Sequence, residues 1–373
     1  MSDEKHATSG GGRVRRSYVF ARRRWKLVAG LSIVAMFYAV AVCADFLAPG
    51  DYRAQSRREP AAPPSVIRFR DAGGRWHARP FIYARRLVDP LQRRYVEDTS
   101  HPYPLAFFKR GYTYKLLGLF PADRHLFGVR DEGQTEARAL DETTTPRVYL
   151  LGTDGLGRDR LSRRLVASRV SLAVGPLGTL LACALGVFLG CLAGYAGRLS
   201  EALLMRVADT MMALPALVVI LAARAAFPLE LPPVRAGLLI VTIFALVGWA
   251  EMARVTRGLV LALRQREFVL AALALGLSEA RVLFRHILPN AARPLVVQAT
   301  LLLPAFLLAE TALSFLGVGL QEPEPSWGNM LAEASDITLL RRGHALVLLT
   351  PALAIFLFVL GVRLLSDGVR KDR

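Results

Sequence analysis

Several signatures of chemistry are missing from the sequence. No Gly-Lys pair occurs in its 373 residues. Because a phosphate-binding P-loop needs Gly-Lys followed by Ser or Thr, a nucleotide site of that kind is excluded from this chain. Cysteine is scarce as well: Cys43, Cys183 and Cys191 all lie in apolar runs. This placement argues against a disulfide framework and favours a role as small packing residues.

Metal-ligand spacing is also absent from the most polar part of the chain. His77, His101 and His125 are scattered there without the regular separation of a zinc site. This argues against a membrane-anchored enzyme or sensor with its active part in that region. No internal repeat and no low-complexity tract is present.

Hydrophobic residues are plentiful, and they set the class of protein. They make up 53% of the chain, the mean hydropathy is +0.34 and the net charge is +18. A nucleic-acid-binding protein usually carries its Arg and Lys on one face of a compact domain. Here several apolar runs reach roughly 20 residues, the length that crosses a bilayer. We therefore expect an all-α polytopic membrane protein, with lipid and not nucleic acid as its surroundings.

Six apolar runs predict six transmembrane helices. They are Leu27–Leu47, Leu172–Leu192, Ala208–Phe227, Ala236–Met252, Leu295–Val318 and Ala345–Leu365. The first run is too long for a typical signal-peptide core, so we interpret it as an uncleaved span. Arginine clusters before this run and between the fourth and fifth runs favour a cytoplasmic location for both termini.

The pattern divides the chain into four parts. They are a basic cytoplasmic N-terminus (1–26), the first span (27–47), an extracytoplasmic insert (48–150) and a core with five spans (151–373). The insert mixes polar and apolar residues, and we expect a small mixed α/β fold there. Its stretch "IRFRDAGGRWHARPFIY" predicts a strand, a turn at Gly73-Gly74 and a second strand.

The segment "FVLAALALGLSEARVLFRHILPN" lies between two expected spans, within the connection 253–294. Gly258 and Gly276 interrupt strong helix formers, and Pro289 is expected to end the second helix. We therefore predict a helix–turn–helix whose exposed apolar residues, among them Val269, Leu270 and Leu273, need a partner surface. A surface helix buried among lipid headgroups is the alternative.

Ordered motifs from Leu151 to the C-terminus resemble a known family. They include "LGTDGLGRDRLSR", "GYAGRLSEALLMRVADTMMALP", "REFVLAALALG", "RHILPN", "AETALSFLGVGLQEPEPSWGNML" and "SDGVR". Together they are similar to inner-membrane permeases of ABC importers, in the dipeptide, oligopeptide and nickel branch. The resemblance implies a permease fold of the type I importer kind. The insert is longer than most members of that branch carry at this place.

The resemblance implies that the cytoplasmic segment docks an ATPase. The positions that match the family's docking motif are Leu270, Ala271, Ala272, Gly276, His286, Leu288 and Pro289. The family places Glu where this chain has Leu270, which removes one polar contact. For Gly276 we expect a bend at which any side chain would clash.

A second set of residues matches family motifs with a structural or gating role. It consists of Gly152, Thr153, Asp154, Gly157, Arg158, Asp159, Arg206, Asp209, Pro215 and Glu310. The alternating charges from Asp154 to Arg163 favour a self-satisfied ion network at the start of the second span over catalysis or metal binding. Arg206 and Asp209, three residues apart on a helix, could pair at the cytoplasmic boundary; a solvated ion pair that contributes little stability is the alternative.

Glu310 lies well inside an apolar run, where a carboxylate is costly and usually faces a cavity or a partner. A contact with the solute pathway and a structural bond between subunits are both compatible with this position.

The resemblance also implies partners and a division of labour. The chain would move solute without chemistry or a cofactor of its own, while two ATPase subunits, identical or different, bind ATP and Mg. A second homologous permease and an extracytoplasmic solute-binding protein would complete the importer. The expected cargo is a di- or oligopeptide; nickel or another small solute is the alternative. A secondary transporter is a further alternative, but it would need more polar residues inside its spans.

Overall fold

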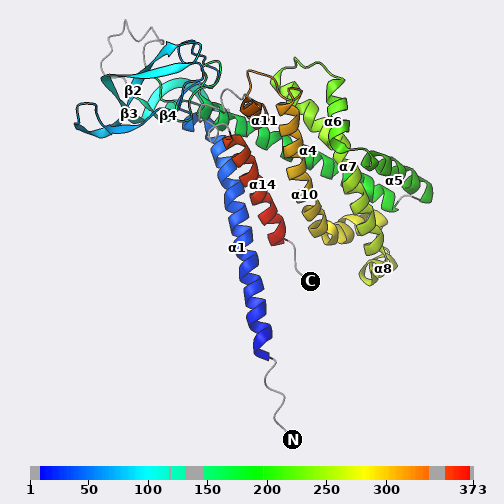
Figure 1. Ribbon diagram of the computed structural model, residues 1–373. Coiled ribbons are helices and arrows are strands. Elements are labelled where there is room, and N and C mark those ends of the chain that lie inside the picture. Colours follow the sequence, from blue (N-terminus) through cyan, green and yellow to red (C-terminus); the bar gives the residue numbers. More distant parts are fainter. Residues whose placement is uncertain (1–8, 117–118, 131–145, 196, 336–348, 370–373) are drawn as a thin grey trace. The chain divides into compact units, whose positions relative to one another are not determined.

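The computed structural model describes residues 9–116, 119–130, 146–195, 197–335 and 349–369 (Figure 1). The chain divides into two compact units. The first comprises Met1–Met36, Ala173–Leu320 and Leu353–Arg373, and the second comprises Phe37–Leu172 and Gln321–Ala352. Each unit is described by itself below.

Helices make up most of the described chain. They are α1 (Ser9–Val42), α2 (Ala44–Leu47), α4 (Arg160–Tyr195), α5 (Arg198–Ala213), α6 (Ala216–Ala225), α7 (Pro233–Arg264), α8 (Glu267–Ala274), α9 (Glu279–Val282), α10 (Leu288–Phe315), α11 (Trp327–Ala332) and α14 (Thr350–Val369). A π-helical turn, η1 (Leu283–Ile287), joins α9 to α10, and a 3₁₀ turn, η2 (Glu333–Ser335), follows α11.

Five of the described helices are long and apolar enough to cross a membrane. They are Arg24–Val42, Arg160–Tyr195, Pro233–Arg264, Glu279–Phe315 and Thr350–Val369. The number is six if α5 and α6, which meet at a bend of 90°, count as one span. The prediction of one continuous helix over Ala208–Phe227 is therefore wrong. Leu214 is extended because the ring of Pro215 disfavours a helical conformation in the residue before it.

Two expectations for the segment 253–294 are also wrong. Gly258 does not turn the chain, since α7 continues through it to Arg264. Pro289 does not end a helix, since it lies in the first turn of α10. It follows closely on the π-helical turn η1, where the ordinary α-helical hydrogen-bond pattern is already changed. The π-helical turn of η1 carries the helix from α9 into α10 without a break.

Glycines allow α1 and α14 to pack closely within the first unit (Figure 1). A Cβ on Gly30 would lie 2.7 Å from the carbonyl oxygen of Gly361 and 2.7 Å from the backbone nitrogen of Leu365. Lys26 Nζ and Asp367 form an ion pair of 2.7 Å at one end of this contact. Small residues at helix crossings of this kind are a common basis of association between membrane helices.

We predict that Gly30→Leu forces α1 away from α14. Its side chain meets backbone atoms, which cannot rotate aside, so overpacking should cost about 1–3 kcal/mol and lower the melting temperature in detergent. Val28→Leu is the matched control, because it adds bulk at an exposed position on the same helix. Equal melting temperatures for the two variants would contradict this packing.

A second row of glycines joins α4 to α7. A Cβ on Gly186 would lie 2.7 Å from the carbonyl oxygen of Trp249, and one on Gly190 would lie 2.5 Å from that of Ala253. One turn further, Gly194 faces Val260 at 2.7 Å. Glycine at every fourth residue thus presents a bare backbone stripe to α7.

The second unit contains a four-stranded antiparallel sheet. Its strands are β1 (Arg68–Arg70), β2 (Trp76–Asp89), β3 (Arg94–Leu116) and β4 (Phe120–Val129), paired in chain order. The predicted strand–turn–strand at Gly73-Gly74 is confirmed, and Gly74 takes a φ of +84°. Among the described residues of 48–150 the regular structure is this sheet alone, so the helical part expected for the insert is not found there.

Candidate functional site

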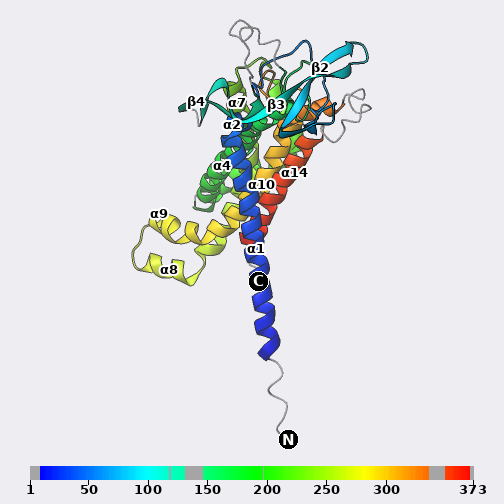
Figure 2. The same ribbon diagram turned by 90° about the vertical axis from the view of Figure 1, so that its left-hand side faces the viewer.

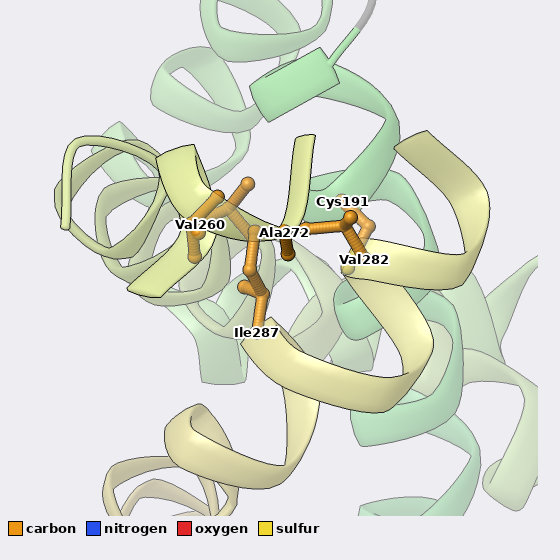
Figure 3. Packing of buried hydrophobic residues seen from close by; sticks show 6 residues of the cluster. Cys191, Val260, Ala272, Val282 and Ile287 are labelled. Atoms are coloured by element: carbon orange, nitrogen blue, oxygen red, sulfur yellow. The ribbon is translucent and has the colours of Figure 1, made fainter. Parts of the chain in front are cut away.

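A buried apolar cluster holds the segment after α7 in place. It consists of Cys191 on α4, Val260 on α7, Val269 and Ala272 on α8, Val282 on α9 and Ile287 on η1, and is called the loop core below (Figure 3). Val269 and Ala272 are three residues apart, so they lie on one face of α8. Both point into the loop core, and through it α8 contacts two long helices of the same unit.

Four large apolar side chains of the loop are exposed. Phe268, Leu270 and Leu275 are 43%, 54% and 83% exposed, and Phe284 on η1 is 69% exposed. These four exposed residues are together called the apolar ridge below. The sequence prediction was right for Leu270 but wrong for the other two residues it named. Val269 is fully buried and Leu273 is partly buried, because both lie on the face that packs on the loop core.

The alanines and the glycine of the docking motif play different roles. Ala271 is exposed next to Leu270, while Ala272 is buried in the loop core. Gly276 has a φ of +80°, a conformation that side-chain-bearing residues rarely adopt. A Cβ added there would meet nothing within 4 Å. The expected clash at Gly276 is therefore wrong, and it is the backbone conformation that favours glycine.

The remaining motif residues lie where the loop returns to α10. His286 is half-buried on η1, and its carbonyl oxygen accepts a hydrogen bond of 2.6 Å from the Asn290 side chain. Leu288 packs against the loop core, and Pro289 is exposed. π-Helical turns are rare and occur often at functional sites, so η1 marks this return as a specialised element.

The elements that carry the apolar ridge also carry exposed charges of both signs, with Glu267 and Glu279 beside the arginines. Arg266, Arg281 and Arg285 are exposed. Arg264 lies 3.8 Å from the Glu279 carboxylate, and its guanidinium lies 4.9 Å from the centre of the Tyr195 ring. Figure 2 shows α8 and α9 standing out from the long helices to which they are connected. The loop is thus a packed projection with exposed apolar side chains and exposed arginines.

Ion pairs between α5 and α7 replace the pairing expected within α5. Asp209 pairs with Arg254, and Glu201 accepts a hydrogen bond of 2.7 Å from Arg257 Nε. The expectation that Arg206 would pair with Asp209 is wrong for the described structure. The helix–helix contact places Arg254 closer to Asp209 than its neighbour on α5. Pro215, the last residue of this motif, is the N-cap residue that precedes α6.

The motif that precedes α4 lies in the second unit and forms the ion network expected for it. Asp154 is 2% exposed and accepts from Arg158 Nε at 2.6 Å, with Arg163 Nε 3.7 Å away. Its other carboxylate oxygen accepts the backbone N–H groups of Leu156 and Arg158 at 2.9 Å each.

The sequence did not predict Glu322, which completes the network. Its two carboxylate oxygens accept from Arg158 at 2.5 Å and from Arg163 at 2.7 Å. Glu333 similarly pairs with Arg160 at 3.2 Å. The acidic residues of "QEPEPSWGNML" were the available signal, but nothing local to them indicates a partner more than 150 residues earlier in the chain.

The backbone of this motif also packs closely against other parts of the second unit, at positions where glycine is required. Gly157 has a φ of +77°, and a Cβ there would lie 2.1 Å from the carbonyl oxygen of Ser56. Gly152 has a φ of +70° and faces the carbonyl oxygen of Ala62 at 2.4 Å. Thr153 is buried, and its hydroxyl oxygen accepts the Ala62 N–H at 2.7 Å.

Asp159 caps the first turn of α4. Its carboxylate accepts the backbone N–H and the hydroxyl of Ser162, at 2.9 and 2.5 Å. Burial raises the pKa of Asp159 to about 6, although these hydrogen bonds oppose the shift. Since anions favour helix N-termini, we assign this carboxylate to capping.

Glu310 lies within α10 and is fully buried. The Ser314 hydroxyl, one turn further along the helix, donates to its carboxylate at 2.9 Å. A short local hydrogen bond of this kind partly satisfies a buried carboxylate. This contact is internal to one helix, and the choice between a pathway role and a subunit contact stays open.

These elements define a multi-span helical membrane protein with a protruding loop. Comparison with known proteins makes the class more specific. Residues 186–371 match the family described as binding-protein-dependent transport system inner membrane component. The chain belongs to this family, whose members are multi-pass permeases of the bacterial inner membrane.

This chain matches 70% of the length of each of three curated relatives. The dipeptide transport system permease protein DppC of Alkalihalophilus pseudofirmus is 37% identical over 222 residues, which are 60% of this chain and 70% of the relative. The di/tripeptide transport system permease protein DppC of Pseudomonas aeruginosa is 40% identical over 223 residues, again 60% and 70%. The oligopeptide transport system permease protein OppC of Bacillus subtilis is 36% identical over 222 residues, with the same coverage.

Proposed function

We propose that this chain is the permease subunit of an ATP-driven importer of di- or oligopeptides, delivered by an extracytoplasmic binding protein. The family and the names of the relatives support this function. The observation that carries it is the apolar ridge on a loop fixed to the long helices. Apolar side chains exposed on a rigid projection are a typical protein-interaction surface. We assign the ridge to an ATPase subunit.

The loop core supplies a mechanical connection. Val269 and Ala272 of α8 pack on Val260 of α7 and Cys191 of α4, so a displacement of α8 acts on both helices. The glycine stripe of α4 against α7 continues this contact along the spans. ATP and Mg belong to the partner ATPases in this proposal. Closure of the ATPases shifts α8, and the helices alternate between inward-facing and outward-facing arrangements.

Leu270 replaces the family's Glu with an apolar contact. Its side chain is 54% exposed and belongs to the apolar ridge. We propose that this residue adds buried apolar area to the ATPase contact where the polar contact is missing. The flanking arginines then provide the polar rim that surrounds such interface centres.

We propose the following orientation. Both termini and the connection 253–294 are cytoplasmic, and the insert 48–150 is extracytoplasmic. The arginine-rich N-terminus and the arginines of α7 to α10 support this orientation through the positive-inside rule. The Asp154 network then lies on the outer side and braces the start of the second span. A second homologous permease completes the pathway.

Photo-crosslinking tests the ATPase contact. A photoreactive amino acid at Leu275, the most exposed residue of the apolar ridge, should give an adduct with the ATPase subunit in membranes of the source cells. The matched control carries the same amino acid at Leu91, which is 93% exposed in the turn between β2 and β3. An ATPase adduct from both positions, or from Leu91 alone, would contradict the proposal.

Uptake into proteoliposomes tests the cargo. The complete complex, purified with its ATPases and binding protein, should take up a labelled dipeptide with ATP, and unlabelled peptide but not nickel should compete. Competition by nickel alone would replace the peptide assignment with the nickel alternative. Uptake driven by an ion gradient without ATP would replace the class of transporter.

A further inference from the structure

His125 on β4 makes two contacts that a neutral histidine cannot satisfy. Its imidazole is 2% exposed. Nδ1 lies 2.8 Å from the carbonyl oxygen of Asp45 on α2, and Nε2 lies 3.1 Å from that of Tyr112 on β3. Carbonyl oxygens only accept hydrogen bonds, whereas a neutral imidazole has one N–H and one acceptor nitrogen. Both contacts are hydrogen bonds only if both ring nitrogens carry protons.

The imidazole is closely packed among neighbouring residues. A Cβ on Gly111 would lie 2.6 Å from Cδ2 of His125, so the imidazole fills the space that this glycine leaves open. The rings of Tyr112 and Tyr114 lie 4.4 and 5.2 Å from the imidazole, centre to centre. In the neutral form one ring nitrogen would face a carbonyl oxygen, lone pair against lone pair, away from water. An unmade buried hydrogen bond of this kind is costly.

The environment suits a positive charge on this ring. Aromatic faces attract cations at these distances. Burial raises the pKa of both tyrosines, which therefore stay neutral. The Asp45 carboxylate accepts from Arg169 Nη1 at 2.8 Å. The charged or titratable groups that act on the two tyrosines or face His125 across the strands are Cys43, Asp45, Asp51, Lys109, Asp123 and Arg169.

We propose that His125 is a proton-operated clamp between α2 and the β3–β4 hairpin. The doubly protonated imidazole joins the backbone of α2 to that of β3, and loss of one proton removes one of these bonds. Because the clamped arrangement requires the proton, clamping strengthens as pH falls and weakens as pH rises. All these groups lie in the second unit, and the proposal does not depend on the transport function.

Hydrogen–deuterium exchange on the full-length protein in lipid nanodiscs tests the clamp. Protection factors, corrected for intrinsic exchange, are compared for peptides covering α2 and β4 at about pH 5.5 and about pH 8. We expect protection roughly tenfold higher at the lower pH, as the loss of one buried hydrogen bond implies. Equal protection at both pH values would overturn the proposal.

Two histidine variants distinguish a pH effect that comes from His125 from one that comes from other groups. His125→Gln offers one donor nitrogen and does not titrate, so protection of α2 and β4 should become low and independent of pH. His101→Gln, at an exposed position on β3, should keep the wild-type profile. A wild-type pH profile in His125→Gln would refute the clamp.

If His125→Gln loses the whole sheet, ¹⁵N-histidine NMR of the wild-type protein decides the question. Two protonated nitrogens on His125 in the protected state support the clamp. One protonated nitrogen in that state overturns it.

Discussion

Gly276→Arg is expected to reduce ATP-driven uptake to less than about one tenth of wild type while membrane insertion and protein level stay close to normal. A Cβ at this position enters open space, so the arginine does not disturb the loop core. Its strain at a φ of +80° costs about 1–2 kcal/mol, which a folded helical protein tolerates. The long charged side chain instead projects beside Leu275, where the ATPase is proposed to sit. Uptake by the reconstituted complex is the measurement.

Gly276→Asn separates the two possible causes of lost uptake. Asparagine tolerates positive φ better than other residues with a side chain, and it is small and uncharged. It should therefore retain most of the uptake. Equal loss in both variants would assign the effect to backbone conformation and not to docking. Normal uptake with Gly276→Arg would remove Leu270–Gly276 from the ATPase contact.

Run length in the sequence predicted most of the spans but not the course of every helix. Mean hydropathy over a window counts apolar residues and carries no information about bends in the backbone. Ala208–Phe227 therefore looked like one span, although Pro215 divides it into two helices at a bend of 90°. In the same way Pro289 looked like a stop. The helix nevertheless runs through it, shortly after the π-helical turn η1, which the residues around it do not indicate.

The family motif in α8 could be recognised from the sequence, but the buried and exposed faces of α8 could not. Val269 and Leu270 are adjacent and similarly apolar, yet one is fully buried and the other is 54% exposed. Their difference comes from the phase of α8 against α4 and α7, which the loop sequence does not contain. Phe284 joins the apolar ridge for the same reason, since the π-helical turn sets its direction.

The ion network shows the limit of local patterns most clearly. Alternating charges from Asp154 to Arg163 indicated a self-satisfied network, and the pairing of Asp154 with Arg158 confirms that part. The local residues nevertheless leave two buried arginines partly unmatched. Glu322 supplies the missing carboxylate from a distant part of the chain. Only tertiary structure could identify this residue.

Asp154→Ala is expected to destabilise the second unit more than any other single carboxylate change we consider. The carboxylate is 2% exposed, pairs with two arginines and accepts two backbone N–H groups. Its removal leaves Arg158 and Arg163 buried with only the half-exposed Glu322 as counter-charge. Losing one partner of a buried ion pair costs roughly 3–5 kcal/mol. We expect a clearly lower melting temperature in detergent and rapid proteolysis of the 37–172 region.

Asp89→Ala is the control that isolates the arginine pairing. Asp89 also accepts two backbone N–H groups, from Leu91 and Gln92 at 2.8 and 2.9 Å, but these contacts lie in an exposed turn of the sheet. Its removal should cost only about 1 kcal/mol, the usual effect of such hydrogen bonds. If Asp154→Ala destabilised the protein no more than Asp89→Ala, the charges around Asp154 would be adequately solvated. The network would then add little to the start of α4 beyond the hydrogen bonds of its turn.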